Sequence, residues 1–234
     1  MSPTPVLDIR DLRFRRPGRD WQLALSALRL QAGETIFLHG PSGSGKSTLL
    51  SLIAGTLAPQ DGRLQVCGAD MAALSGAARD RLRANRLGII FQQFNLLPFL
   101  GMVDNVRLPC RFSSRRAGAA SERFGSPEKA AMALLERLGL GDPALRAAPV
   151  AELSVGQQQR VAVARALIGA PGLVLADEPT SALDSDARDG FLQLLFAECE
   201  AARAALLFVS HDLAMAPRFT HQASLSALAA GAPA

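Results

Sequence analysis

The sequence predicts an α/β protein with a mostly parallel core sheet, an N-terminal antiparallel β part and a helical insertion. Three observations lead to this prediction. Short apolar runs alternate with helical patterns along the chain, which is typical of a parallel sheet covered by helices. A glycine-rich stretch, residues 40–47, separates an apolar run from a helical pattern. Residues 96–153 lack the strand pattern and indicate a helical insertion into the core.

The composition is that of one globular domain. The chain has 234 residues, of which 49% are hydrophobic and 20% charged, so we expect a single domain over 1–234 with the insertion at 96–153 inside it. The net charge is +4, and all basic residues except Lys46 and Lys129 are arginines. We interpret this excess of arginine as a compositional bias, because net charge bears on solubility and association and not on fold.

Three cysteines lie far apart without a CxxC pair, which argues against a disulfide framework or a zinc site and suits a reducing compartment. There is no signal-peptide pattern and no apolar run of 18 residues. We therefore expect a cytoplasmic chain.

The elements follow in order from the apolar patterns. We expect early strands at 6–12 and 23–30, paired beside the core. Buried strands are predicted at 35–38, 87–91, 173–176 and 205–209, and helices at 46–54, 157–168 and 186–202.

Inside the insertion, residues 111–125 are polar and rich in arginine, so we expect an exposed loop or a poorly ordered helix end. The next helix opens with Ser126 as its N-cap, Pro127 in its first turn and Glu128 near the positive end of the dipole, and it ends near Gly139.

Residues 40–47 match the pattern G-x-x-x-x-G-K-[ST] in full, between a predicted strand and a predicted helix. Such a loop arranges backbone N–H groups around phosphates at a helix N-terminus. Lys46 is expected to reach the β- and γ-phosphates, and Ser47 to ligate Mg²⁺. The predicted nucleotide-binding residues here are Gly40, Ser42, Gly43, Gly45, Lys46, Ser47 and Thr48. The sequence thus predicts a P-loop site for ATP and Mg²⁺.

A P-loop needs a second Mg²⁺ ligand besides Ser47, and it is expected at the end of a neighbouring strand. Asp177 and Glu178 follow the apolar run 173–176, at the edge where ligands of open α/β sheets bind. We expect Asp177 to act on Mg²⁺ and Glu178 to polarise the attacking water as a general base.

The stretch from Leu153 to Arg160, LSVGQQQR, resembles the signature motif of the ATP-binding cassette (ABC) ATPases, usually written LSGGQ. Three further positions resemble that family in the same order. Gln92 is similar to its Q-loop glutamine, residues 181–184 to its D-loop, and His211 to its switch histidine.

The resemblance implies two cassettes paired head to tail, with each ATP between one P-loop and the other signature. Ser154 and Gly156 would then meet the γ-phosphate held by the partner protomer, and Asp184 would lie in the D-loop. Glu178, His211 and Gln92 would be catalytic, with Gln92 also sensing Mg²⁺.

Two positions depart from the family pattern. Val155 replaces the first signature glycine, so its backbone must be ordinary or strained, since a β-branched residue disfavours positive φ. The residue that stacks on adenine is usually aromatic but falls at Arg16, whose guanidinium can also stack; Trp21 and Phe14 are alternatives.

The segment 91–106, FQQFNLLPFLGMVDNV, resembles the branch of lipoprotein-releasing, macrolide-exporting and cell-division ATPases. That resemblance implies a separately encoded membrane-spanning permease, a second ABC protomer that forms a homodimer with the first, and a location at the inner face of the membrane. Phe94, Leu96, Leu97 and Phe99 either receive a helix of the membrane partner or fill the core of the insertion.

The resulting prediction is an ATPase subunit of a transport or mechanotransmission complex. The alternative within the family is a regulator of an envelope process such as cell division. A soluble ABC protein acting on nucleic acid or the ribosome is disfavoured, because the chain has neither tandem cassettes nor a long coiled-coil insertion. We expect no nucleic-acid partner, and the signature and D-loop together exclude a simple metabolic kinase.

Overall fold

The computed structural model describes residues 4–15, 22–143, 145, 148–181 and 183–229. It contains two compact units, one formed by Met1–Arg83 with Ala205–Ala234 and the other by Ala84–Ala204. Helix α2 (Gly76–Arg86) crosses from the first unit into the second and has no fully buried residue.

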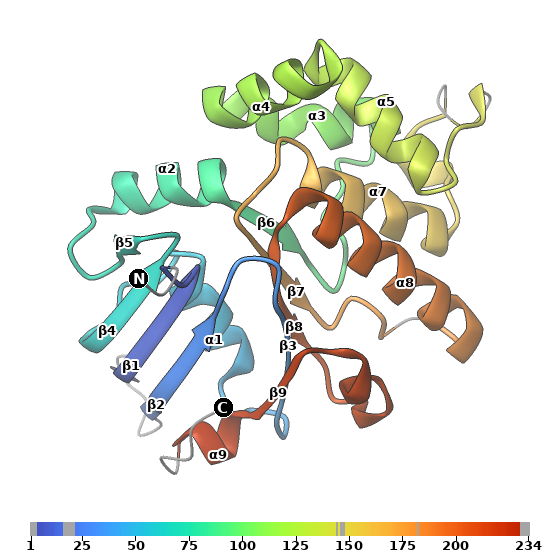
Figure 1. Ribbon diagram of the computed structural model, residues 1–234. Helices are drawn as coiled ribbons and strands as arrows, with labels where there is room; N and C mark the ends of the chain where they lie inside the picture. Colours follow the sequence, from blue (N-terminus) through green and yellow to red (C-terminus); the bar gives the residue numbers. More distant parts are fainter. Residues whose placement is uncertain (1–3, 16–21, 144, 146–147, 182, 230–234) are drawn as a thin grey trace. The chain divides into compact units, whose positions relative to one another are not determined.

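The first unit begins with an antiparallel sheet in the order β2-β1-β4-β5 (Figure 1). Its strands are β1 (Leu7–Arg15), β2 (Gln22–Leu30), β4 (Asp61–Val66) and β5 (Ala69–Asp70). The side chains of β1 alternate between a buried apolar face and an exposed basic face. A register irregularity between Arg10 and Arg13 encloses Asp11, whose φ is 48°. This confirms the predicted N-terminal antiparallel part.

Three parallel strands complete the first unit: β3 (Thr35–His39), β8 (Ala205–Val209) and β9 (His221–Ser224). β3 lies between the other two, with Leu38 opposite Val209 on one side and Ala223 on the other. Every residue of β8 is buried, as expected for a strand covered on both faces. Helix α1 (Lys46–Ile53) follows β3, while the 3₁₀ helix η2 (Leu213–Arg218) and α9 (Leu225–Ala229) flank β9.

In the second unit, β6 (Leu87–Ile90) pairs in parallel with β7 (Leu173–Asp177). The helices of this unit are α3 (Met102–Phe112), α4 (Ser114–Phe124), α5 (Pro127–Arg137), the 3₁₀ helix η1 (Val150–Glu152), α7 (Val155–Leu167) and α8 (Ser185–Ala202). A Cβ on Gly88 would lie 2.4 Å from the carbonyl oxygen of Ala166, so only glycine lets β6 and α7 approach this closely.

The predicted strands and helices are present, with ends within three residues of those expected. The helix after Ser126 is confirmed in detail: the Ser126 hydroxyl accepts the Lys129 N–H, Pro127 is in the first turn, and Gly139 follows the helix with φ 73°. Among the described residues, no helix combines the length and apolar character needed to cross a membrane.

The prediction for 111–125 is wrong. This stretch forms α4, which is N-capped by Ser113 and carries the buried Arg116. The Arg116 guanidinium donates to the carbonyl oxygens of Leu87, Arg165, Ala166 and Ile168. Because three of these carbonyls belong to the last turn and the C-cap of α7, the arginine satisfies helix-terminal acceptors that would otherwise lack partners. Burial lowers the pKa of Arg116 to about 10, so it remains charged at neutral pH.

Candidate functional site

The glycine-rich loop lies between β3 and α1, as predicted. Gly43 and Gly45 have φ of 77° and 106°, which other residues rarely adopt. Gly45 is the N-cap of α1 and offers no side-chain hydrogen bond, and the first turn of α1 has no acidic residue. The N–H groups at this end, including those of Ser47 and Thr48, thus have no side-chain acceptor from the cap and suit an anionic ligand.

Two side chains of this loop point to a phosphate ligand. The ammonium of Lys46 donates to the carbonyl oxygens of Gly40 and Pro41 at 2.7 and 3.0 Å, which folds its side chain over the loop. The Ser44 hydroxyl oxygen is buried and has no hydrogen-bond partner among the described residues. Since buried polar atoms are normally satisfied, Ser44 fits a loop completed by a ligand oxygen. The sequence prediction did not single out Ser44, and Ser42 is exposed on the same loop.

His211 lies at the same sheet edge as the loop. Leu38 pairs with Val209, and the N–H of Ser210 donates to the carbonyl of Leu38 at 3.2 Å. Gly40 and His211 each follow that strand pair by two residues. The first unit therefore brings the loop and His211 to the carboxyl ends of neighbouring parallel strands, where α/β proteins bind ligands.

The second unit brings together three other predicted residues in the same way. Ile90 pairs with Ala176, so Gln92, Asp177 and Glu178 lie one or two residues beyond the last residue pair of these neighbouring strands. Glu178 has φ 47°, an uncommon value for a residue with a side chain. Backbone strain of this kind concentrates at functional sites. The side-chain amide of Gln159 donates to the carbonyl of Pro179 at 2.6 Å and anchors the chain directly after Glu178.

The predicted signature residues form the N-terminus of α7. Ser154 caps the helix: its hydroxyl oxygen accepts the Gln157 N–H, while the Gln157 side chain accepts the Ser154 N–H at 2.9 Å. Val155 is the first helical residue and is not among the residues with positive φ, so its backbone is ordinary. A Cβ on Gly156 would meet nothing within 4 Å, so the space at this position of the first turn is open.

Asp184 is the N-cap of α8, and its carboxylate accepts the Ala187 N–H at 2.8 Å. The predicted adenine position, Arg16, and its alternative Trp21 lie outside the described residues. The other alternative, Phe14, is 5% exposed and belongs to the core of the antiparallel sheet.

The loop after Gln92 is held by Arg165 and Asn105, which the sequence did not indicate as site residues. Phe94 and Asn95 both have positive φ, and Arg165 of α7 donates to the carbonyl oxygens of both. Asn105 of α3 is fully buried, and its side-chain amide bonds to the backbone of the segment 97–101. An asparagine within an apolar helical pattern was the available signal for this role.

The four apolar residues proposed for partner contact divide into two groups. Phe94 is 9% exposed and packs inside, whereas Phe99 is 75% exposed. Leu96 and Leu97 are half-buried. Only Phe99 is freely available to another protein.

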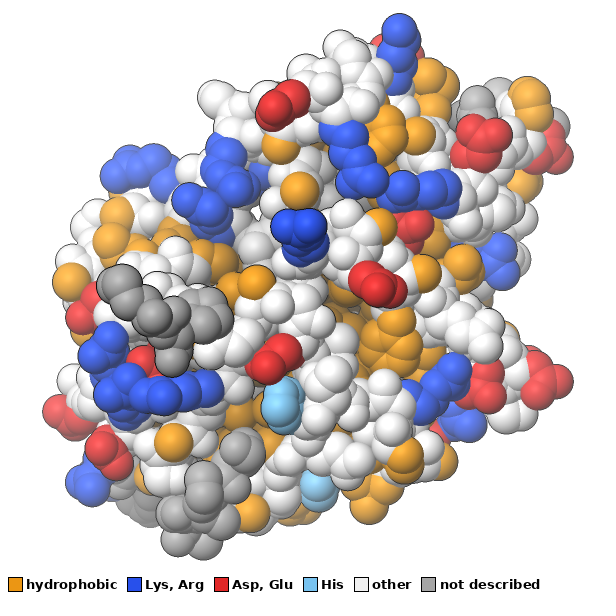
Figure 2. Space-filling model, viewed as in Figure 1, with side chains coloured by type: hydrophobic (Ala, Val, Ile, Leu, Met, Phe, Trp, Pro, Cys, Tyr) orange, Lys and Arg blue, Asp and Glu red, His pale blue; other side chains and the backbone are white. Residues whose placement is uncertain are grey.

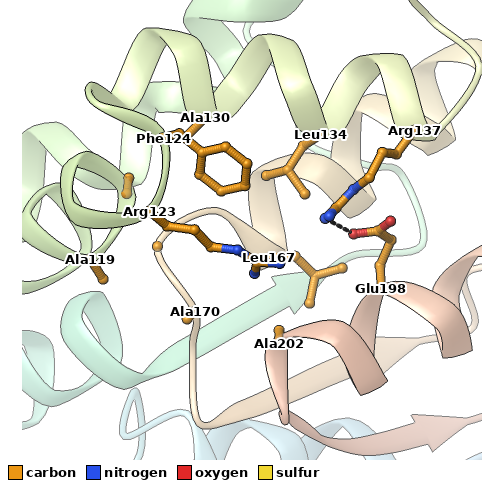
Figure 3. Close-up of a pocket in the computed structure, with 12 residues that line it drawn as sticks. Ala119, Arg123, Phe124, Ala130, Leu134, Arg137, Leu167, Ala170, Glu198 and Ala202 are labelled. Carbon is orange, nitrogen blue, oxygen red and sulfur yellow. Dashed lines mark hydrogen bonds and ion pairs between the residues drawn. The ribbon is translucent and has the colours of Figure 1, made fainter.

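A separate small cavity lies between α4, α5, the end of α7 and α8 (Figure 3). Phe124, Leu134 and Leu167 line it, and an ion pair between Arg137 and Glu198 closes one side. None of its lining residues is a predicted site residue.

Parallel strands followed by a phosphate-binding loop and a helix define the class of P-loop nucleotide-binding ATPases. Residues 24–181 match the family described as ABC transporter. The chain is 41% identical to the lipoprotein-releasing system ATP-binding protein LolD of Pseudomonas fluorescens, over 92% of both chains. It is 44% identical to the uncharacterized ABC transporter ATP-binding protein YbbA of Escherichia coli K12, over 82% of this chain and 80% of the relative.

Among solved structures, it resembles the ATP-binding cassette MJ0796 in a dimeric post-hydrolysis state with ADP and Pi. The TM-score is 0.77 and the identity 32%, over 93% of both chains. The chain belongs to the ABC transporter family. It is an ATP-binding and ATP-hydrolysing cassette of that family.

Proposed function

We propose that this cassette hydrolyses ATP to drive a separate membrane-spanning subunit, in a complex that moves lipoproteins or related molecules at the bacterial envelope. The observation that carries the proposal is the similarity to a lipoprotein-releasing ATP-binding protein over 92% of both chains. Matching over nearly the whole length of both proteins supports a shared role for the whole subunit, and not only a shared nucleotide-binding fold.

The P-loop holds the phosphates of ATP. The N–H groups at the start of α1 donate to phosphate oxygens, and the Lys46 ammonium exchanges its two loop carbonyls for the β- and γ-phosphates. By the resemblance to the family, the hydroxyl of Ser47, the carboxylate of Asp177 and the amide oxygen of Gln92 would hold Mg²⁺, an ion that prefers oxygen donors. The Mg²⁺ ion would neutralise charge that develops on the transferred phosphoryl group.

Three side chains act on the hydrolytic step. Glu178 takes a proton from the attacking water as the general base. His211 donates a hydrogen bond to the γ-phosphate and holds it in place. Gln92 senses Mg²⁺ and links it to the helical insertion through the loop that carries Phe99, since Arg165 and Asn105 fix that loop to α7 and α3.

A second copy of the chain completes each site. The Ser154 hydroxyl and the Gly156 N–H of one protomer meet the γ-phosphate bound by the other, and Asp184 lies in the segment that crosses the dimer interface. Ser154 suits this role because its oxygen already accepts a hydrogen bond within the capping box, which leaves its hydrogen to donate. Arg16 stacks on the adenine ring.

The membrane-spanning partner docks through the segment 96–99, with Phe99 as the main apolar contact. The cassette is then peripheral to the inner face of the membrane, held there by its partner. No nucleic-acid partner is proposed.

The test is the ATP turnover of Glu178→Gln, beside the control Glu200→Gln, which removes an exposed carboxylate of α8. We expect Glu178→Gln to bind ATP with wild-type affinity, to lose more than about 100-fold in turnover, as loss of a general base implies, and to form a stable dimer with ATP. The control should match the wild type. Unchanged turnover in Glu178→Gln would refute the role of Glu178.

The same variant tests the partner. Tagged Glu178→Gln with ATP is captured from detergent-solubilised native membranes, beside Glu178→Gln/Phe99→Ala. We expect a membrane subunit with few spans and a large extracytoplasmic domain, lost when Phe99 is replaced. Recovery of ribosomes or nucleic acid in its place would overturn the proposed function.

A further inference from the structure

The exposed face of the antiparallel sheet carries three arginines around one carboxylate. Asp8 of β1 is 3% exposed, and its oxygens accept two hydrogen bonds from Arg10, at 3.2 and 3.0 Å, and one from Arg29 at 3.0 Å. Arg63 of β4 forms a longer ion pair with Asp8, at 3.7 Å. Figure 2 shows basic side chains gathered over these strands with acidic atoms among them.

The charges in this cluster do not balance. One carboxylate faces three guanidinium groups, and the two-point contact of Arg10 is already a complete partner for it. Arg63 stands directly opposite Arg10 in the antiparallel register. Like charges in directly opposed positions destabilise a sheet, so stability of the sheet does not account for Arg63.

The arrangement leaves hydrogen-bond donors facing solvent. Arg10, Arg29 and Arg63 all approach Asp8 through Nε. The second terminal nitrogen of Arg10 and both terminal nitrogens of Arg29 and Arg63 have no hydrogen-bond or ion-pair partner among the described residues. The three side chains are 46–56% exposed. Asp8 therefore gathers terminal nitrogens of three arginines, one from Arg10 and two each from Arg29 and Arg63, in one place.

We infer that Arg10, Arg29 and Arg63 form a binding site for a phosphate group on this sheet face. Guanidinium forks match the geometry of tetrahedral oxyanions, and a bound phosphate would offset the excess positive charge. The site consists of strand residues and uses no residue of the P-loop. Its ligand carries an accessible phosphate, as a free phosphorylated molecule or as a lipid headgroup.

The experiment titrates the full chain with inorganic phosphate by calorimetry and by thermal unfolding. Saturating Mg·ADP fills the nucleotide site, and chloride keeps the ionic strength constant. The variants are Arg29→Gln and Arg63→Gln, because Arg10 forms the strongest contact with the buried Asp8 and its loss endangers folding. Arg81→Gln is the control, since Arg81 is an exposed arginine of α2 in the same unit.

We expect phosphate to bind and stabilise the wild type and Arg81→Gln equally, and to bind at least fivefold more weakly to Arg29→Gln and Arg63→Gln. Without phosphate, Arg63→Gln should melt at or above the wild-type temperature, because it removes a repulsion. An equal phosphate response in all four proteins, or no response in any of them, would overturn the inference.

Vesicles distinguish the two sources of phosphate. The same proteins are floated with neutral phosphatidylcholine vesicles and with vesicles containing phosphatidic acid. Flotation that needs phosphatidic acid, Arg29 and Arg63 supports a lipid headgroup. Phosphate binding without flotation supports a free phosphorylated ligand. Binding of an acidic peptide without any response to phosphate would contradict the site.

Discussion

Replacing Asn105 tests how the loop that carries Phe99 is held. The Leu97 N–H donates to Oδ1 of Asn105 at 2.8 Å. Nδ2 lies 3.0, 3.2 and 3.2 Å from the carbonyl oxygens of Leu97, Leu100 and Gly101. Because Nδ2 has only two hydrogens, these contacts amount to three full hydrogen bonds at most.

At about 1 kcal/mol net for each bond, Asn105→Ala should lower the free energy of unfolding by about 3 kcal/mol. Urea unfolding measures this loss. Hydrogen exchange supplies a local reading, because the Leu97 amide should lose its protection in Asn105→Ala. Asn105→Asp tests the acceptor and the donor of the side chain separately. It keeps the oxygen that accepts from the Leu97 N–H but replaces the donor Nδ2 by an oxygen that faces the three carbonyls.

Phe99→Ala is the control, since it removes an exposed ring from the same loop and should leave both the stability and the Leu97 protection unchanged. The reasoning is refuted if the free energy of unfolding of Asn105→Ala lies within about 0.5 kcal/mol of the wild-type value, which is the uncertainty in the net contribution of one hydrogen bond, and the Leu97 amide is still protected.

Three further predictions concern buried charges and thiols. Arg116→Met should destabilise the protein by about 3–5 kcal/mol in urea unfolding, because carbonyls at the end of α7 lose a buried charged donor. Burial favours the neutral form of Asp8, but its hydrogen bonds and charge interactions with Arg10 and Arg29 outweigh this and hold its pKa below the usual value. Its stabilisation is therefore complete at neutral pH and is lost as the pH falls below about 4, and Asp8→Asn should remove that part of the acid dependence measured by thermal unfolding. Burial, with the nearby charge of Glu198, raises the pKa of the Cys199 thiol to about 12. Iodoacetamide at pH 8 should therefore label Cys199 only after denaturation, which peptide mass spectrometry measures. Labelling of the native protein at the rate of a free thiol would contradict this prediction.

Local signals in the sequence were sufficient for the strands, the main helices and the glycine-rich loop. Apolar runs, the Ser126 cap and the loop motif all act within a few residues of the structure they specify. Arg116 shows why the prediction for 111–125 failed. An arginine-rich segment is normally solvated, but this side chain is buried because it reaches four carbonyls from 29 to 52 residues away in the sequence.

Site residues could likewise be predicted only where they belong to a sequence motif. Glu178 and Ser154 were found from their positions, but the positive φ of Glu178 and the bond from Gln159 to Pro179 come from tertiary packing. Asn105 and Arg165 belong to no motif that the sequence reasoning used, and each acts by fixing the backbone of another segment. Such positioning residues become visible only when the chain is folded.

The N-termini of α1 and α7 differ in capping: α1 has no side-chain cap, whereas α7 has a capping box. Gly45 leaves the first turn of α1 uncapped, as suits a site that an anion completes. Ser154 and Gln157 cap α7 through two reciprocal hydrogen bonds, which stabilise this end without a ligand and do not involve the Gly156 N–H. Val155 is compatible with that cap because its backbone is helical, and a Cβ on Gly156 would meet nothing within 4 Å. The first signature glycine can therefore be replaced by valine without loss of the cap.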